Sequence, residues 1–328
     1  MPDLETCRIL NGMWQVSGAH GSIDSTAAIT RMLAHHLAGL TTWDLADHYG
    51  PAEDFIGAFR RRLAAEQGAD ALRQMQAFTK WVPNPGPMTR SVVEAAIDRS
   101  LHRMGVETLD LLQFHWWDYD DPRYRDALDE LDRLRTAGRI RHLALANFDT
   151  AHLATILDAG IPVVSNQVQY SLVDLRPEVH MVELCRARHV QLLAYGTLCG
   201  GLLAERFLGQ PEPGRGRLDT ASLQKYKQMI DIWGGWALFQ QLLEALNVVA
   251  EKHQASIANV AVRTIMDRPA VAGVIVGVRL GLSDHLDDTL RAFDVRLDAD
   301  DHARINAVLA SARNLASLIG DCGDEYRR

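Results

Sequence analysis

The sequence predicts a single (β/α)8 barrel, and three observations lead to this fold class. Short apolar runs alternate with amphipathic stretches along nearly the whole chain, which is typical of repeated βα units and a parallel sheet. Eight such runs occur within 328 residues, the size of one large barrel. No change of composition marks a boundary. We therefore expect one domain over residues 1–328, with a long loop after the seventh strand.

The eight apolar runs are expected to form the strands, in chain order 9–15, 41–44, 75–80, 109–115, 139–146, 163–167, 191–195 and 274–277. Between and after them, apolar residues recur at helical spacing. This pattern predicts helices at 89–104, 124–137, 237–253, 256–267, 284–293 and 298–311. In the second of these, Leu128, Leu131 and Leu134 share one face, and Gly138 follows where a helix commonly ends.

The stretch 196–236 departs from the plain repeat because it is far too long for an ordinary βα loop. It contains a segment rich in proline and glycine at 210–217. Loops of this length in compact domains are usually lids or binding loops. We therefore expect a lid or binding loop after the seventh strand.

Composition and charge argue against several classes of function. The hydrophobic fraction of 47% and the charged fraction of 23% are those of a soluble globular protein. Because 42 acidic residues face 34 basic ones, the surface lacks the positive charge that binds nucleic acid or anionic membranes. The N-terminus carries charges where a signal peptide needs an apolar core, and no stretch reaches the roughly 20 apolar residues of a membrane span. We expect a cytoplasmic protein.

The cysteines fit that compartment. They are widely scattered without a CxxC pair, which favours reduced thiols over a disulfide framework or a zinc site. The four are Cys7, Cys185, Cys199 and Cys322.

Ionisable side chains close or follow several of the predicted strands, where a (β/α)8 barrel carries its chemistry. Four of them are Asp44, Tyr49, Lys80 and His115. A lysine ammonium inside a dry barrel is costly unless a carboxylate neutralises it, and Asp44 on the neighbouring strand can do so. Beside that ammonium the pKa of Tyr49 would fall from near 10 toward the working pH, as a general acid requires. His115 could then orient a substrate carbonyl.

Several motifs together resemble the aldo-keto reductase superfamily. They are WDLADHYG at 43–50, FTK at 78–80, LDLLQFHW at 109–116 and SNQVQY at 165–170, and the similarity extends from Gly12 to about Leu297. The resemblance implies a (β/α)8 fold and a nicotinamide cofactor, usually NADPH. It also implies a catalytic tetrad in which Tyr49 donates a proton and Lys80 lowers its pKa. Asp44 would pair with Lys80, and His115 would position the carbonyl.

The resemblance further implies a cofactor site. Tyr195 would stack on the nicotinamide, and Asn147 and Gln167 would hold its carboxamide. The pyrophosphate loop would comprise Gly196, Thr197, Leu198, Cys199, Gly200 and Gly201. The site for the adenosine and its 2′-phosphate would comprise Gly277, Arg279, Ser283 as an N-cap, His285, Asp288 and Thr289.

Some positions depart from the superfamily pattern. Ala146 and Gly196 stand where many members carry serine, so fewer side chains would hold the nicotinamide. Arg279 is the single fixed positive charge of the adenosine loop, so we expect NADPH, with NADH possible as an alternative.

Tryptophans follow or close several strands and the long loop. We expect an aromatic substrate pocket built from Trp14, Trp81, Trp116 and Trp233, with Trp117 and Trp236 as further rings of the same aromatic box. No cationic cluster accompanies them apart from Arg215 and Arg217, which favours a neutral aldehyde or ketone.

The sequence thus predicts an NADP(H)-dependent reductase of a small carbonyl compound, or an enzyme that runs the reverse reaction. One alternative is a cofactor-binding regulatory or sensor protein of the same fold with little turnover. A metal-dependent hydrolase is a weaker alternative, because only Asp44 and His115 close strands with inward parity and no metal site is expected. The substrate's identity and the oligomeric state stay open.

Overall fold

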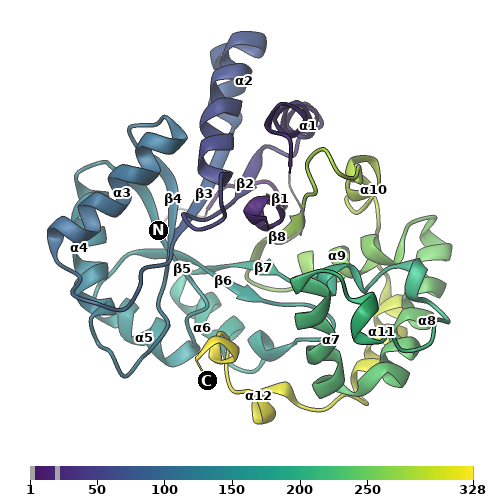
Figure 1. Ribbon diagram of the computed structural model, residues 1–328. Coiled ribbons are helices and arrows are strands. Elements are labelled where there is room, and N and C mark those ends of the chain that lie inside the picture. The colour runs from purple at the N-terminus through teal and green to yellow at the C-terminus, as the bar shows by residue number, and fades with distance from the viewer. Residues whose placement is uncertain (1–3, 19–22, 328) are drawn as a thin grey trace.

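Eight parallel strands form a closed barrel in which each strand pairs with its neighbours in chain order and β1 pairs with β8 (Figure 1). The structure is a computed structural model that describes residues 4–18 and 23–327. The strands are β1 Ile9–Gly12, β2 Thr42–Asp44, β3 Gln76–Trp81, β4 Leu109–His115, β5 Ile140–Ala146, β6 Val163–Gln169, β7 Gln191–Tyr195 and β8 Val271–Gly277. The predicted (β/α)8 barrel is confirmed.

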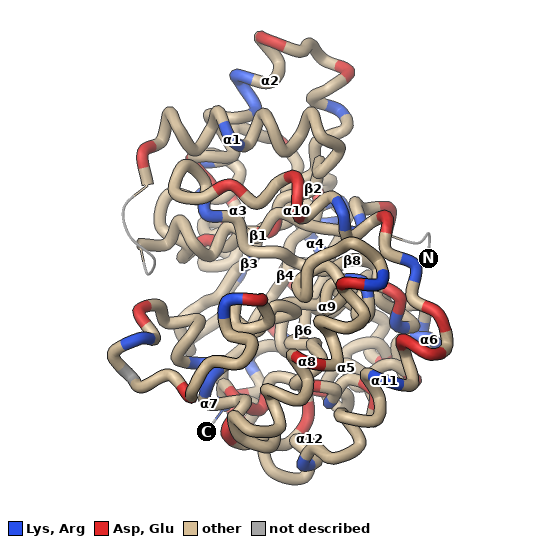
Figure 2. The backbone as a smooth tube through the Cα atoms, turned by 90° about the vertical axis from the view of Figure 1, so that its right-hand side faces the viewer, with Lys and Arg blue, Asp and Glu red and all other residues tan. Residues whose placement is uncertain are grey.

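Helices surround the barrel, and charges of both signs are interspersed over them (Figure 2). Those up to the end of β7 are α1 Ser25–Leu37, α2 Ala52–Gln74, α3 Arg90–Met104, α4 Tyr124–Thr136, α5 Thr150–Asp158 and α6 Met181–Arg188. The later ones are α7 Ala221–Trp233, α8 Gly235–His253, α9 Ile257–Met266, α10 Leu286–Arg291, α11 Ala299–Leu309 and α12 Leu315–Leu318. No helix in the described ranges is both long enough and apolar enough to cross a membrane.

Local sequence explains where several helices begin and end. The side chains of Ser256 and Asn259 form a capping box at the start of α9, and Asp298 and Asp301 do the same for α11. Gly138 follows α4 with a positive φ of 81°, in the left-handed conformation that ends many helices.

Several predicted elements differ from the structure; the eighth strand, for example, begins at Val271, three residues before its expected start. The first strand ends at Gly12, because the chain turns into a 3-10 helix at Trp14–Ser17. The expected loop 196–236 contains α7, whose N-terminus is capped when the Thr220 side chain accepts a hydrogen bond from the Leu223 amide. The expected helix 284–293 is shortened to α10.

The barrel interior has an apolar layer that supports a polar one. Its apolar residues are Leu4, Leu10, Phe78, Leu111, Ala144, Val164, Leu193 and Ala272. Side chains two residues apart on a strand face the same side, so Lys80 lies beyond Phe78 and Gln113 beyond Leu111 toward the carboxyl ends of the strands. We call that end of the barrel the mouth.

Candidate active site at the carboxyl ends of the strands

A buried ion pair lies at the mouth. The Lys80 Nζ donates hydrogen bonds to both carboxylate oxygens of Asp44, at 2.9 and 2.8 Å. The side-chain amides of Gln113 and Gln167 also donate to Asp44 Oδ1, at 2.9 and 2.6 Å. We call these four residues the polar layer. Its hydrogen bonds compensate for the desolvation of two buried charges. The side-chain amide of Gln167, which was expected to hold a cofactor, is directed toward Asp44 instead.

Tyr49 lies in the loop after β2, beside the polar layer. Its ring centroid is 5.0 Å from the Lys80 Nζ and 5.0 Å from the Trp14 ring, which meets it edge to face. Burial and then the Asp44 carboxylate raise the pKa of Tyr49 well above its ordinary value. The net direction is therefore opposite to the expected fall of this pKa, because burial and the carboxylate that pairs with Lys80 both favour the neutral phenol.

His115 closes β4 and is only 3% exposed. Its Nδ1 lies 3.0 Å from the backbone oxygen of Ala146. Burial, with smaller contributions from the positive charges of Arg327 and Lys80, lowers the pKa of His115 to about 4. Its Nε2 is buried and has no hydrogen-bond partner among the residues that the structure describes. The ring contacts Trp117, with centroids 4.5 Å apart.

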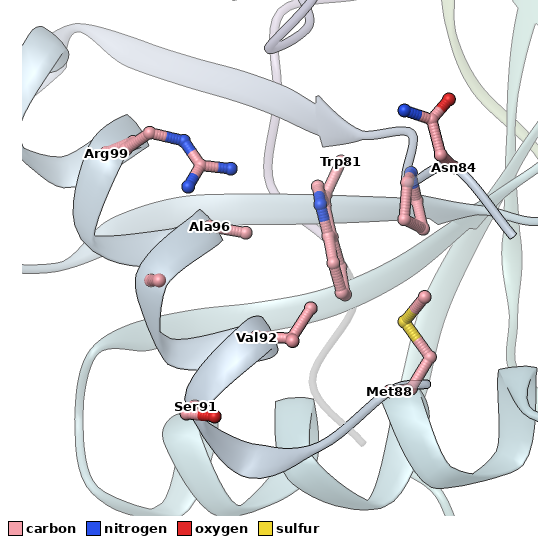
Figure 3. A pocket seen from close by; sticks show the side chains of 9 residues that line it. Trp81, Asn84, Met88, Ser91, Val92, Ala96 and Arg99 are labelled. Atoms are coloured by element: carbon pink, nitrogen blue, oxygen red, sulfur yellow. The ribbon is translucent and has the colours of Figure 1, made fainter. Parts of the chain in front are cut away.

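Two of the four predicted pocket tryptophans point away from the mouth. Trp81 is buried against Phe114 and lines a groove of about 430 Å³ on the outer side of the barrel, where Figure 3 shows it beside Val92 of α3. Trp116 also packs against Phe114, and its indole donates to the backbone oxygen of Asp121. Successive side chains of a strand point to opposite faces of the sheet. Since Lys80 and His115 face the barrel interior, the residues that follow them, Trp81 and Trp116, face outward.

The other aromatic predictions have mixed outcomes. Trp14 lies at the mouth as expected, and so does Trp117, whose ring contacts His115 there. Trp233 is buried at the end of α7, where its backbone oxygen accepts a hydrogen bond from the Arg313 amide. It lies eight residues beyond Lys225 on this helix, about 12 Å along the axis.

Residues 321–327, here called segment 321–327, complete the mouth, and sequence reasoning missed them. The Tyr326 hydroxyl lies 2.9 Å from that of Tyr195, and the Lys225 Nζ also donates to it. The ring of Tyr326 is 6.2 Å from that of His115, and Tyr326 also contributes to the raised pKa of Tyr49. In the sequence, Tyr326 is far from the end of any described strand, so no sequence signal identified it.

Ion pairs and ring contacts hold segment 321–327 in place. The buried guanidinium of Arg176 donates to Glu325 at 2.9 Å and pairs with Asp174. The Arg327 guanidinium stands 3.9 Å from the centroid of the Tyr119 ring. The segment is therefore anchored on both sides of Tyr326.

Two of the three residues predicted around a nicotinamide, Asn147 and Tyr195, lie together at the ends of β5 and β7. The Tyr195 hydroxyl donates to Asn147 Oδ1 at 2.9 Å, and Asn147 has a positive φ of 60°. The loop that follows Tyr195 packs beneath α7, since a Cβ at Gly196 would overlap the Tyr226 hydroxyl. The loop residues are Gly196, Thr197, Leu198, Cys199, Gly200 and Gly201.

The residues predicted to bind the adenosine and its 2′-phosphate differ in how well their positions agree with that prediction. Arg279 is exposed, and no described carboxylate lies within ion-pairing distance of it. Ser283 does not cap α10, because His285 occupies that position. Asp288 accepts a hydrogen bond from Ser256 at the start of α9, and the Thr289 amide donates to the backbone of His285.

Several buried polar atoms on the loops at the mouth have no partner among the described residues. They are Gln15 Oε1 after β1, His115 Nε2 at the end of β4, Thr197 Oγ1 after β7 and Ser283 Oγ after β8. Gly277 leaves room for Gln15, whose side-chain amide lies where a Cβ would stand. Because buried polar atoms are normally satisfied, this set fits an extended polar ligand such as a nicotinamide dinucleotide.

Within residues 4–18 and 23–327, no three or more His, Cys, Asp or Glu side chains are arranged to hold a metal ion. The carboxylate and imidazole at the mouth are instead engaged by Lys80 and by the backbone of Ala146.

Comparison with known proteins gives consistent matches. The family model described as "Aldo/keto reductase family" matches residues 8–310. Flagellar radial spoke protein 5 of Chlamydomonas reinhardtii is 29% identical over 68% of this chain, and the match spans 49% of that protein. NADH-specific methylglyoxal reductase of Escherichia coli (strain K12) is 24% identical over 91% of this chain and 93% of its own.

Solved structures match the fold. A glycerol dehydrogenase from Gluconobacter oxydans superposes with a TM-score of 0.76 at 24% identity, covering 94% of this chain and 93% of that one. A thermostable aldo-keto reductase superposes with a TM-score of 0.68 at 21% identity, covering 94% of this chain and 100% of that one.

Proposed function

The chain belongs to the aldo/keto reductase family, and from this premise we propose that it is an NADP(H)-dependent oxidoreductase that reduces an aldehyde or ketone to an alcohol, or runs the reverse reaction. The observation that carries the proposal is the buried Asp44–Lys80 pair with Tyr49 and His115 beside it at the mouth. Four ionisable groups in a largely apolar barrel need a chemical reason, and carbonyl reduction uses all of them.

The nicotinamide end of the cofactor would be held by Tyr195 and Asn147. The backbone of the loop that begins at Gly196 would approach the pyrophosphate, and Arg279 would meet the 2′-phosphate. When bound, the cofactor supplies the hydride that reduces the carbonyl carbon. The exposed positive charge of Arg279, which meets no described carboxylate, supports NADPH, whereas the NADH-specific relative shows that NADH must be tested beside it.

Tyr49 is assigned as the proton donor. Because burial and Asp44 raise its pKa, the phenol carries its proton throughout the neutral range and can give it to the developing alkoxide. The Lys80 ammonium lies beside the ring, and in a site from which water is excluded a positive charge there stabilises the negative charge that builds up on the oxygen.

The walls of the mouth support a small neutral carbonyl substrate. Trp14 packs on Tyr49, Trp117 packs on His115, and the Tyr326 ring lies 6.2 Å from that of His115. These rings offer an apolar surface with few polar groups, which is the usual construction of a small-molecule site.

The experiment is a kinetic survey of small aldehydes and ketones with NADPH and NADH side by side, on wild type and Tyr49→Phe. The substitution deletes the proton donor and almost no volume, so activity should fall by roughly 10²- to 10⁴-fold while cofactor affinity stays close to that of wild type. Tyr124→Phe, on the outer helix α4, is the matched control.

A loss of less than about tenfold on Tyr49→Phe would contradict the assignment of Tyr49. Cofactor binding without turnover of any carbonyl or alcohol would contradict the proposed enzyme and favour a regulatory protein of the same fold.

A further inference from the structure

We infer that Lys225 makes this protein bind the reduced nicotinamide cofactor more tightly than the oxidised one. Lys225 lies on α7, in the stretch that follows β7, and no motif or strand end in the sequence points to it. The inference rests on the proposed function, in which the nicotinamide lies against Tyr195. It begins from the way in which the Lys225 ammonium is held.

The Lys225 ammonium lies close to three tyrosine rings. Its Nζ is 5.3 Å from the centroid of Tyr195, 5.4 Å from that of Tyr226 and 4.5 Å from that of Tyr326. The ammonium also donates a hydrogen bond to the Tyr326 hydroxyl. A cation within about 6 Å of a ring centroid is attracted by the electrons of the ring. These contacts hold a positive charge from α7 beside the end of β7.

The charge of Lys225 is not neutralised by an ion pair. The other three lysines of the chain each pair with a carboxylate. Lys225 has a phenol as its partner, and within the described part of the chain no carboxylate forms an ion pair with it. The carboxylate of Glu325, next to Tyr326 in sequence, accepts a hydrogen bond from Arg176 at 2.9 Å instead. The field of the Lys225 ammonium therefore extends into the mouth.

Hydrogen bonds fix the Tyr195 ring beside this charge. Its hydroxyl donates to Asn147 Oδ1 at 2.9 Å and lies 2.9 Å from the Tyr326 hydroxyl. Paired aromatic rings have centroids about 4.5 to 7 Å apart, so a nicotinamide on Tyr195 lies within about 12 Å of the Lys225 Nζ on either face of the ring. Lys225 thus acts on the nicotinamide whichever face of Tyr195 it takes.

The two forms of the cofactor differ in charge at the nicotinamide. The oxidised ring is a pyridinium cation and the reduced ring is neutral, whereas the rest of the molecule is the same. Tyrosine rings alone would attract the pyridinium by a cation–π interaction. Here the Lys225 ammonium already makes that interaction, and it repels a second positive charge. At an effective dielectric constant of about 20, this repulsion over about 12 Å lowers the affinity roughly tenfold.

This preference has a consequence for carbonyl reduction. The oxidised cofactor is a product of that reaction, so its weaker binding lessens product inhibition. In an equal mixture of the two forms, the reduced cofactor occupies the larger share of the sites. The charge of Lys225 therefore suits a protein that takes up reduced cofactor and releases the oxidised form.

The test is calorimetric titration of NADPH and NADP⁺, with NADH and NAD⁺ in parallel, into wild type and Lys225→Met. Wild type should have the larger dissociation constant for the oxidised form. Methionine keeps most of the side-chain length and removes the charge, so the ratio of the oxidised to the reduced dissociation constant should fall roughly tenfold. Lys225→Arg should keep the wild-type ratio. Lys252→Met is the control, because Lys252 lies on α8 and pairs with Asp298.

An unchanged ratio in Lys225→Met, with both forms still bound, would overturn the inference and leave the proposed function standing. An equal loss of affinity for both forms would also overturn it, since Lys225 would then only support the structure of the site. A wild type that binds the oxidised form as tightly as the reduced one, or more tightly, would contradict the inference as well. If neither cofactor binds in either form, the proposed function fails and this inference fails with it.

Discussion

Arg279 is the side chain on which the choice between the two nicotinamide cofactors should depend. It is exposed and meets no described carboxylate, so its charge is available to a 2′-phosphate. A charge-assisted contact of this kind contributes about 1.5 to 3 kcal/mol, or roughly 10- to 150-fold in affinity. We expect Arg279→Ala to weaken NADPH by that factor and to leave NADH nearly unchanged, as measured by calorimetric titration.

The control for this experiment is Arg291→Ala, which removes an exposed arginine from the end of α10. An equal loss of affinity for both cofactors in Arg279→Ala would mean that Arg279 does not contact the 2′-phosphate.

The pKa of His115 should also be visible in the stability of the protein. The unfolded histidine titrates near 6.5 and the folded one at about 4. Between these values the unfolded chain binds a proton that the folded chain does not, so the free energy of unfolding decreases as the pH falls through this window. At pH 5 the penalty from His115 is about 2 kcal/mol relative to pH 7.5.

Urea unfolding at both pH values would measure the difference, with His115→Phe as the variant that lacks the contribution of His115. His102→Phe is the control, because His102 is exposed on α3. A wild type and a His115→Phe variant with the same pH dependence would contradict the lowered pKa.

Sequence reasoning identified single residues well where strand alternation could be read directly. Lys80 and His115 were located because each closes an apolar run and must face the barrel interior. Trp81 and Trp116 were misplaced because each directly follows one of those residues in the sequence. Adjacent residues of a strand face opposite sides, so the two tryptophans face outward. The tautomer of His115 depends on the backbone of Ala146, which is 31 residues away in sequence.

At the level of elements, the contact between α2 and α3 depends on a glycine. A Cβ at Gly57 would overlap the backbone oxygen of Arg103, which belongs to the last turn of α3. Alanine is a better helix former than glycine by about 1 kcal/mol. We nevertheless expect Gly57→Ala to lower the free energy of unfolding by about 1 to 3 kcal/mol, because overpacking forces the helices apart.

Thermal or urea unfolding would check this, with Gly86→Ala as the control. Gly86 lies in a loop where a Cβ would meet only one atom, at 3.9 Å, and its φ is not positive. An unchanged or higher stability of Gly57→Ala would mean that the two helices separate at little cost.

The number of strands could be predicted from the sequence, whereas the helices and the exact ends of the elements were predicted less well. All eight strands were found, since each is a short apolar run bounded by polar turns. The helix α7 was not predicted because the turn-rich segment 210–217 dominates the stretch before it. Its stability comes from packing, as Tyr226 and Ile230 are buried against the rest of the molecule.

On the scale of the whole molecule, segment 321–327 joins the active site to distant parts of the chain. Arg176 donates to Glu325 across 149 residues, and Arg327 donates to the backbone oxygen of Trp116 across 211. No local pattern can predict contacts of such separation. The aromatic side chain of Tyr326 was therefore the part of the candidate site that the sequence could not reveal.

We expect Glu325→Gln to loosen this segment without unfolding the barrel. A hydrogen bond between charged groups contributes about 1.5 to 3 kcal/mol, so amide exchange at Tyr326 and Arg327 should be roughly 10- to 150-fold faster. Hydrogen exchange followed by mass spectrometry would measure it. Glu94→Gln, in an exposed pair with Arg90, is the control. Unchanged exchange would show that the ring contacts alone hold Tyr326.

The distribution of indole rings gives the molecule an optical property. Five of the seven tryptophans are buried, namely Trp43, Trp81, Trp116, Trp233 and Trp236. Trp14 and Trp117, 36% and 39% exposed, flank Tyr49 and His115. Dissolved acrylamide therefore has access chiefly to the emission of these two rings, which is also the component at the longest wavelengths. A molecule that binds in the mouth will shield these two rings from acrylamide. Its binding can therefore be followed by tryptophan fluorescence, before any chemical step takes place.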